Sequence, residues 1–440
     1  MNKAWTLAIE ALSWVELQRI NEDSALARTI KQLNIDDLEV IFKAKELIYE
    51  VLNRRNALDY LISKGLHPVQ LIYLELGVRN FLRIFTYMSH YGEASFQVIN
   101  ELANHARLLL GSNSLEPVED AIDIIPHLNI PWEELRRTEK LAYRYFHPEW
   151  YINYLKGYFD ESKVIDIIKP VKVTKYIRLN TLKADENLLD LLFTQGFQLI
   201  KAPEIDNTYR VLDNHDTLVE TPSYQEGEII FQDKASVLVG EVASPQPGDL
   251  VLDICAAPGV KTSHLAQIMD NKGKIISIDY DERRLDSWRE LIETMGVKNA
   301  EAVLADATNA SEFPDVMADL VLIDPPCTGT GTFNDYPSGK WRINENSIHR
   351  MASLQKKIID NAGDHVTEGG SLIYSTCTIT YEENEGIIKY FLRKHPSFST
   401  VEATPRMGEK GLNGLLECQR LYPYLHESQG FFIAKLVKSE

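Results

Sequence analysis

The sequence predicts an α/β protein with a doubly wound parallel sheet at residues 244–440. A linker with a small α+β subdomain at 161–243 and an all-α domain at 1–160 precede it. Two observations carry this prediction. From residue 248 onward, short β-branched runs alternate with amphipathic helical stretches, which is typical of parallel strands joined by crossover helices. Before residue 160, apolar residues recur almost only at helical spacing.

Length and composition indicate a globular chain outside the membrane. Its 440 residues suggest two or three domains, at about 150 residues per domain. No apolar run approaches the ~20 residues of a membrane span, and the first residues lack the apolar core of a signal peptide. We therefore expect a cytoplasmic monomer without membrane contact.

The charge balance excludes a uniformly basic nucleic-acid binder. The chain has 64 acidic and 46 basic side chains and a net charge of −18. Two local basic stretches, 163–178 and 340–357, are nevertheless suited to contact RNA phosphates.

The all-α prediction for residues 1–160 rests on helical periodicity and capping. Trp5, Ile9 and Leu12 follow a 3.6-residue period, and Asp36 or Asp37 is placed to cap a long helix with a broad apolar face. The subdomain at 161–243 has a different pattern, with strands at 176–181 and 197–202 around a helix at 185–193.

The C-terminal sheet is predicted from five short apolar runs, each followed by a helical stretch or a loop. A further run at 431–437 is expected to form a closing edge strand. The five predicted strands are 250–254, 274–279, 300–304, 320–323 and 371–374, and the helices are 262–269, 283–295, 354–365 and 384–395.

The loop after the first strand is predicted to bind a nucleoside-like ligand. Its small residues let backbone N–H groups approach a ligand at a helix N-terminus. It matches neither a phosphate-binding P-loop nor the G-x-G-x-x-G of nicotinamide-binding proteins. Asp279 ends the second strand, where a carboxylate accepts ribose hydroxyls, and Asp306 follows the third, placed to meet an adenine edge. S-adenosylmethionine fits this pattern better than a dinucleotide.

The ends of the fourth and fifth strands carry an acid and two thiols. Asp324 and Cys327 flank a rigid Pro-Pro turn, and Cys377 follows the fifth strand. If strand order reverses between the first and fourth strands, these ends are neighbours. Carbon 5 of a pyrimidine becomes nucleophilic after a thiolate adds to carbon 6, with an acid at N3 to stabilise the charge. An aromatic residue typical of amino-group methylation is replaced here by Cys327.

The four cysteines contain no C-x-x-C pair, so neither a zinc site nor a redox couple is expected, and we predict no metal. Cys255, Cys327 and Cys377 lie in predicted strand-end loops, which favours thiol chemistry over inert burial. Cys418 has no assigned role.

The C-terminal region resembles the RNA cytosine-5 methyltransferases. The matching stretches run in the family's order at 178–183, 232–236, 253–262, 324–327, 340–341 and 374–377. Two positions depart from the family pattern: Val260 replaces a glycine, and Gln429 stands where an aspartate is usual.

The resemblance implies a role for each site residue. It implies Cys377 as nucleophile, Cys327 as the thiol that assists proton removal and release, and Asp324 at N3 of the base and against the methyl donor. The donor site it implies, for S-adenosylmethionine, comprises Cys255, Ala256, Ala257, Pro258, Gly259, Val260, Lys261, Asp279, Asp306 and Asp324.

The N-terminal region has an initial helix at 4–19, a helical stretch at 46–52 and the residues 147–150 before the linker. In these features it resembles the NusB-like domain attached to ribosomal RNA members of the family, the Sun/Fmu type, which implies an RNA-binding domain. This favours 16S, small-subunit ribosomal RNA as the substrate, with transfer RNA as an alternative. A non-catalytic RNA-binding assembly factor, and a methyltransferase acting on amino groups or protein, are the other hypotheses. Sensitivity of activity to loss of Cys377 distinguishes them.

Overall fold

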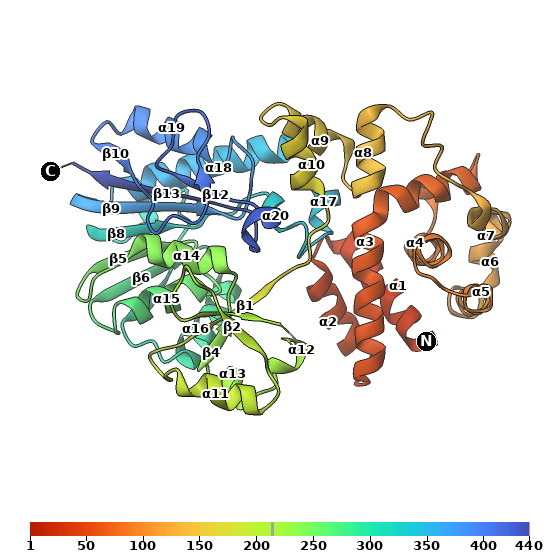
Figure 1. The fold of residues 1–440 in the computed structure, drawn as a ribbon, viewed down its shortest axis with the longest axis horizontal. Coiled ribbons are helices and arrows are strands. Elements are labelled where there is room, and N and C mark those ends of the chain that lie inside the picture. Colours follow the sequence, from red (N-terminus) through yellow and green to blue (C-terminus); the bar gives the residue numbers. More distant parts are fainter. Residues whose placement is uncertain (213–214, 440) are drawn as a thin grey trace. The chain divides into compact units, whose positions relative to one another are not determined.

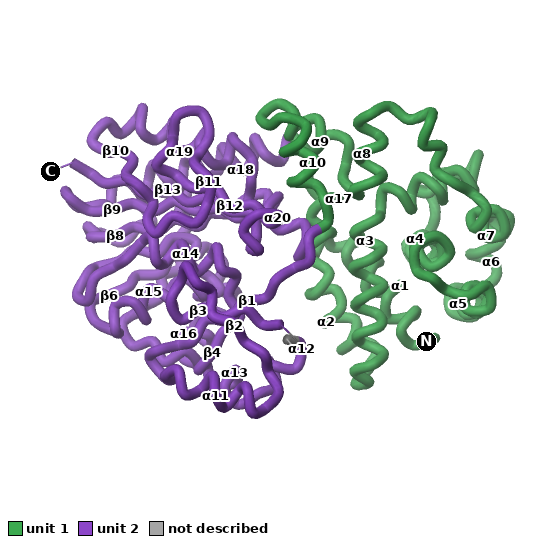
Figure 2. The backbone as a smooth tube through the Cα atoms, viewed as in Figure 1, with its two compact units in different colours: residues 1–170, 336–345 green, residues 171–335, 346–440 purple. Residues whose placement is uncertain are grey.

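The computed structural model describes residues 1–212 and 215–439, which form two compact units (Figures 1 and 2). The helical unit comprises Met1–Pro170 together with Tyr336–Glu345. The sheet unit comprises Val171–Asp335 and the chain from residue 346 onward. Among the described residues, no helix is long and apolar enough to cross a membrane.

The helical unit is all-α, as predicted. Asp37 caps its longest helix by accepting hydrogen bonds from the N–H groups of Glu39 (3.0 Å) and Val40 (3.3 Å). The helices are α1 (Asn2–Gln18), α2 (Glu22–Leu33), α3 (Leu38–Leu66), α4 (Leu76–His90), α5 (Phe96–Leu110), α6 (Ser112–Leu115), α7 (Glu119–Ile124), α8 (Arg137–Tyr145), α9 (Glu149–Lys156), α10 (Glu161–Ile168) and α17 (Gly339–Arg342), with 3-10 turns at Leu71–Tyr73, Glu116–Val118 and Ile125–His127.

The core of this unit is built on α1. Trp5 and Ile9 are fully buried, as are Phe81 and Ile84 of α4, and all four belong to one apolar cluster. Truncating a buried aromatic such as Phe81 to alanine costs about 3–5 kcal/mol, so this cluster accounts for much of the stability of the unit.

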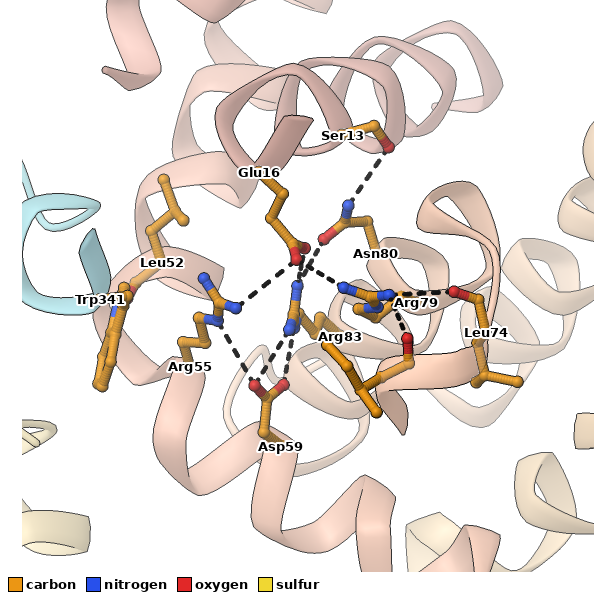
Figure 3. Close-up of polar contacts among 11 residues, drawn as sticks. Ser13, Glu16, Leu52, Arg55, Asp59, Leu74, Arg79, Asn80, Arg83 and Trp341 are labelled. Atoms are coloured by element: carbon orange, nitrogen blue, oxygen red, sulfur yellow. Dashed lines mark hydrogen bonds and ion pairs between the residues drawn. The ribbon is translucent and has the colours of Figure 1, made fainter. Parts of the chain in front are cut away.

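A network of charges lies beside this core, between α1, α3 and α4 (Figure 3). Arg83 donates from Nε to Asp59 Oδ1 (2.7 Å) and pairs with Glu16 through Nη1. Arg79 Nη1 donates to the other oxygen of Glu16 at 2.9 Å, and Arg55 lies 3.6 Å from that oxygen. Burial opposes ionisation of Glu16, but these three guanidinium groups outweigh it and lower its pKa.

The segment Tyr336–Glu345 belongs to the helical unit although it is far from it in sequence. Ser338 donates from N (3.1 Å) and Oγ (2.5 Å) to the buried carboxylate of Glu22. Lys340 Nζ donates to Asn53 Oδ1 at 3.1 Å, and Trp341 Nε1 donates to the carbonyl of Leu52 at 2.6 Å. The prediction that Lys340 contacts RNA is wrong, because its side chain is buried against α3.

The sheet unit begins with the predicted α+β subdomain. Its four antiparallel strands follow the order β2-β3-β1-β4. Arg178 on β1 is fully buried and donates to Gln232, Gln267 and Ser263, so the expectation that it contacts RNA is also wrong. The elements are β1 (Lys175–Leu179), α11 (Asn187–Thr194), β2 (Leu199–Lys201), β3 (Thr208–Val211), α12 (His215–Leu218), α13 (Pro222–Gln225), β4 (Ile229–Phe231) and α14 (Lys234–Ala243).

The main sheet confirms the doubly wound prediction. Its order is β11-β12-β13-β9-β8-β5-β6-β7, with β10 also paired to β13. The strands from β9 to β7 are parallel, and β5 lies between β6 and β8, so the order reverses at the first strand. Its elements are β5 (Leu250–Ile254), α15 (Val260–Ile268), β6 (Lys274–Asp279), α16 (Glu282–Thr294), β7 (Ala300–Leu304), β8 (Ala318–Ile323), α18 (Glu345–Gly363), β9 (Val366–Thr376), α19 (Glu385–Lys394), β10 (Phe398–Val401), β11 (Glu409–Lys410), β12 (Gln419–Leu421), α20 (Pro423–His426) and β13 (Phe431–Lys438), with 3-10 turns at Ala310–Glu312 and Thr330–Thr332.

Helices cover both faces of this sheet (Figure 1). Leu252 and Ile254 of β5 pack in the cluster that contains α18 and α19, whereas Val251 packs with α14 and α15. This alternation is the two-residue period of a strand buried on both faces. The expectation that residues 431–437 form an edge strand is wrong, because β13 pairs with β9, β10 and β12.

Candidate active site

A pocket of about 400 Å³ opens at the carboxyl ends of β5, β6 and β7. Three of the predicted donor-site residues meet in its wall: Cys255, Asp279 and Asp306. They come from three successive strands, as the order of the parallel strands requires. The full lining is Cys255, Ile278, Asp279, Tyr280, Ala305, Asp306, Ala307, Thr308, Pro326, Met351, Leu354 and Ile358.

The loop between β5 and α15 has a conformation that its glycine permits. Gly259 has φ 104°, and a Cβ there would lie 2.9 Å from Cδ1 of Trp288 on α16. Asp279 ties the loop to β6, because its Oδ2 accepts from the N–H of Ala257 at 3.2 Å and lies 3.3 Å from Nη2 of Arg284. The carboxylate that faces the pocket is thereby fixed in orientation.

The other residues of the predicted donor loop do not line the pocket. Ala256 and Ala257 pack on α16 instead of lining the pocket. Pro258 is exposed, Val260 and Lys261 begin α15, and the side chain of Lys261 pairs with Asp324. The donor-site roles of these residues stay a prediction.

Apolar residues of α18 that sequence reasoning missed form one wall of the pocket. Met351, Leu354 and Ile358 recur at positions i, i+3 and i+7, so one face of the helix presents all three. That spacing was visible in the sequence, but nothing in it distinguished a pocket wall from ordinary core. Together with Asp279 and Asp306, this wall makes the pocket polar at the acids and apolar at α18.

Two thiols meet where β8 and β9 end. Cys327 follows the Pro-Pro turn after β8, Cys377 follows β9, and their Sγ atoms are 3.3 Å apart. The adjacency of β8 and β9 explains this contact, because neighbouring parallel strands deliver their carboxyl ends to one edge. Both thiols are half-buried, in the range where a small substrate group has access.

Asp324 lies beside the thiols and is held at both oxygens. Lys261 Nζ donates to Oδ2 at 2.6 Å, and Ser375 Oγ donates to Oδ1 at 3.1 Å. Burial opposes the charge of Lys261, but Asp324 and the neighbouring Cys377 raise its pKa, so the ammonium form is retained. The predicted catalytic residues Asp324, Cys327 and Cys377 are thus brought together.

The environment separates the two thiols. The hydrogen bond to Cys377 is the largest cause that raises the pKa of Cys327 well above its ordinary value, and burial and the charges of Glu383 and Asp324 add to it. The thiol form of Cys327 is therefore favoured. A second buried acid, Asp253, has its pKa raised to about 6 by burial, although Thr262 Oγ1 donates to it at 2.6 Å.

Comparison with known proteins places this architecture in a family. The family model for the 16S rRNA methyltransferase RsmB/F matches residues 241–437. Ribosomal RNA small subunit methyltransferase B of Enterobacter sp. is 31% identical over 67% of both chains. The chain belongs to this family of RNA cytosine-5 methyltransferases.

Further members and structures extend the likeness to RsmB/F proteins. A probable ribosomal RNA small subunit methyltransferase B of Bacillus subtilis is 28% identical over 98% of both chains. A tRNA (cytosine(72)-C(5))-methyltransferase of Pyrococcus horikoshii is 39% identical over 50% of this chain and 55% of that protein. The solved structure of PH0851 has a TM-score of 0.88 at 30% identity and covers 100% of this chain and 99% of that one.

This RsmB/F protein is an S-adenosylmethionine-dependent enzyme that methylates cytosine in RNA. NSun6 from Pyrococcus horikoshii, solved with the S-adenosylmethionine analogue SFG, has a TM-score of 0.61 at 27% identity and covers 67% of this chain and 98% of that one. The pocket fits the cofactor chemically, because its lining combines two carboxylates, Asp279 and Asp306, with apolar side chains of α18.

Proposed function

We propose that this enzyme methylates carbon 5 of a cytidine in 16S ribosomal RNA through a covalent bond between Cys377 and the base. The observation that carries the proposal is the 3.3 Å contact between Cys327 Sγ and Cys377 Sγ beside Asp324. The ribosomal substrate is supported by the Bacillus subtilis relative, whose likeness extends over both units and not only the sheet. The NusB-like helical region at 1–160 is proposed to bind part of that RNA.

In the first step, the Cys377 thiolate adds to carbon 6 of the cytosine ring and a carbon–sulfur bond forms. The displaced electron pair moves to N3, which takes a proton from the Asp324–Lys261 pair (2.6 Å). Carbon 5 is then nucleophilic. S-adenosylmethionine, when bound, supplies the electrophilic methyl group.

In the second step, the proton on carbon 5 must leave. Its bond electrons restore the carbon 5–carbon 6 double bond, and the carbon–sulfur bond breaks to free Cys377 as a thiolate. N3 returns its proton to the Asp324–Lys261 pair. Cys327 is proposed to remove this proton. Cys327 acts as its thiolate, after its own proton has passed to water. The hydrogen bond to Cys377, the largest of the causes that raise the pKa of Cys327, is lost once Cys377 is bonded to carbon, which favours that thiolate.

A denaturing-gel assay with unmodified small-subunit RNA and S-adenosylmethionine tests the proposal. Cys327→Ala is expected to give a shifted protein–RNA band, because release stalls after methyl transfer. The double variant Cys327→Ala/Cys377→Ala is the matched control and is expected to give none. Activity of Cys377→Ala equal to that of the wild type would contradict the covalent route.

Transfer RNA is the second candidate substrate, because the Pyrococcus horikoshii relative is named for it. The same assay with unmodified transfer RNA distinguishes the two substrates. A band with transfer RNA and none with ribosomal RNA would replace the ribosomal assignment. If the wild-type enzyme methylated neither RNA, the non-catalytic assembly factor would be favoured.

A further inference from the structure

A buried carboxylate that the mechanism does not use lies behind the two thiols. Glu383 precedes α19 and is fully buried, with 0% of its surface exposed. It lies between the turn that carries Cys327 and the loop that follows Cys377. A buried acid is costly unless its oxygens are well satisfied, so its contacts indicate why it is there.

Five hydrogen bonds converge on Glu383 from three parts of the sheet unit, the longest from Thr378 Oγ1 to Oε2 at 3.5 Å. Oε1 accepts from the N–H of Thr328 at 2.8 Å and from Gln355 Nε2 at 3.1 Å. Oε2 accepts from Thr328 Oγ1 at 2.5 Å and from Thr380 Oγ1 at 2.7 Å. Gln355 also donates to the carbonyl of Pro326 at 2.9 Å. One carboxylate thus joins the residue after Cys327 to the loop after Cys377.

The two thiol loops depend on Glu383 unequally. Cys377 has a separate anchor in Asn384, whose side chain accepts from Thr376 Oγ1 at 2.5 Å and donates to the carbonyl of Thr378 at 2.9 Å. Cys327 lies between Pro326 and Thr328, which are held by Gln355 and Glu383. Thr328 Oγ1 also lies 3.1 Å from Thr378 Oγ1, so the Cys327 turn keeps this contact without Glu383. Loss of Glu383 nevertheless removes both bonds from Thr328 to the carboxylate, whereas the Asn384 anchor of the Cys377 loop is unaffected.

We propose that Glu383 is a positioning residue for the release step, which holds Cys327 in register with Cys377. The inference rests on the covalent route proposed above, since only that route has a release step. Correct placement of a proton-accepting group within hydrogen-bonding reach controls the rate of proton removal. Displacement of the Cys327 turn then slows release while adduct formation continues at Cys377.

A single-turnover gel assay tests this with ribosomal RNA and S-adenosylmethionine. The readout is the ratio of covalent protein–RNA band to released methylated RNA, which does not depend on how much of the enzyme is folded. Glu383→Ala is expected to raise that ratio about tenfold. Glu383→Gln is expected to restore most of the release, because the amide oxygen can replace Oε1 and its NH₂ can meet the threonine hydroxyls.

Two further variants make the test specific. Asn384→Ala, at the next residue and equally buried, is the matched control and is expected to slow adduct formation without accumulation of the band. Thr328→Val removes one donor to Glu383 at nearly constant volume and is expected to raise the ratio in the same direction. If Glu383→Ala does not fold, the ratio measured for Thr328→Val tests the proposal in its place.

The outcomes separate this inference from the proposed function. A band with Cys327→Ala, but with neither Glu383→Ala nor Thr328→Val, would overturn the role of Glu383 and leave the covalent route intact. Absence of a band with Cys327→Ala would overturn the proposed function itself. Equal ratios for Glu383→Ala and Asn384→Ala would show that Glu383 only supports the fold.

Discussion

Buried carboxylates have charged partners in one unit and neutral partners in the other, and their pKa values shift in opposite directions. In the helical unit, Glu16 pairs with three arginines of α3 and α4, two of which also pair with Asp59, and the pKa of Glu16 is lowered because the guanidinium charges outweigh burial. In the sheet unit, Asp253 and Glu383 accept hydrogen bonds from neutral groups, and burial raises the pKa of both.

The difference separates stability from function. Removing one partner of an arginine-paired acid leaves a buried charge uncompensated and endangers the fold. An acid held by neutral donors beside the thiols reduces stability at neutral pH, and its retention there indicates a requirement of the site. Three predictions test this separation of stability from function, with variants at Arg83, Asp324 and Lys340.

The largest effect is expected in the helical unit. Arg83→Met removes the most deeply buried guanidinium of the network, leaves Asp59 with Arg55 alone and Glu16 with Arg55 and Arg79, and should lower the free energy of unfolding of this unit by about 3–5 kcal/mol. Denaturant titration measures this loss, and the methylation rate per folded molecule should not change. Arg28→Met, at an exposed position on α2, is the control and should stay within about 0.5 kcal/mol. Equal losses for the two variants would contradict a structural role for the network.

Asp324→Asn should show the reverse pattern. The amide cannot exchange a proton with N3 as the Asp324–Lys261 pair is proposed to do, and kcat should fall by about 10²–10³-fold. The midpoint of thermal unfolding should change little, since Asp324 is partly exposed. The control is Asp319→Asn on the same strand, whose side chain accepts from the N–H of Leu250. If Asp324→Asn unfolded readily but its folded fraction methylated RNA at the wild-type rate, Asp324 would serve the fold and not the reaction, which would contradict this comparison of the two units.

A third effect is a change in pH dependence. Lys340 is a buried cation whose Nζ donates to neutral Asn53, and burial lowers its pKa from 10.5 to about 7. Between these values the unfolded chain binds more protons than the folded one, so stability should rise with pH across that interval. The free energy of unfolding of Lys340→Met should not rise with pH in this way, so the stability of this variant relative to the wild type should fall as pH increases. A difference independent of pH would show that Lys340 keeps its charge.

The fold was predictable where local pattern and tertiary environment agree. The bounds of β5, β6 and β7 match the predicted strands. Apolar residues buried on both faces leave few alternatives for β5 and β6, whereas β7 lies at the end of the strand order and is partly exposed. The short strands β10, β11 and β12 were missed, since two to four residues carry no measurable period. Their pairing with β13 and with one another is what places β13 inside the sheet.

The site was predictable where strand order fixes it. Asp279, Asp306 and the thiol pair follow from the carboxyl edge of a parallel sheet. Lys340 was mispredicted because a run of basic residues has the same appearance whether it faces solvent or packs on Asn53, far away in sequence. Glu383 was missed for a similar reason, since its donors come from three separate segments.

The membership of Tyr336–Glu345 in the helical unit has a consequence for biosynthesis. A chain is made from its N-terminus, and domains generally fold as units during synthesis. The buried carboxylate of Glu22 receives its donors only when Ser338 has emerged, after β5 to β8 have been made. The helical unit is therefore the first to leave the ribosome, yet it is completed only after most of the parallel sheet has been synthesised.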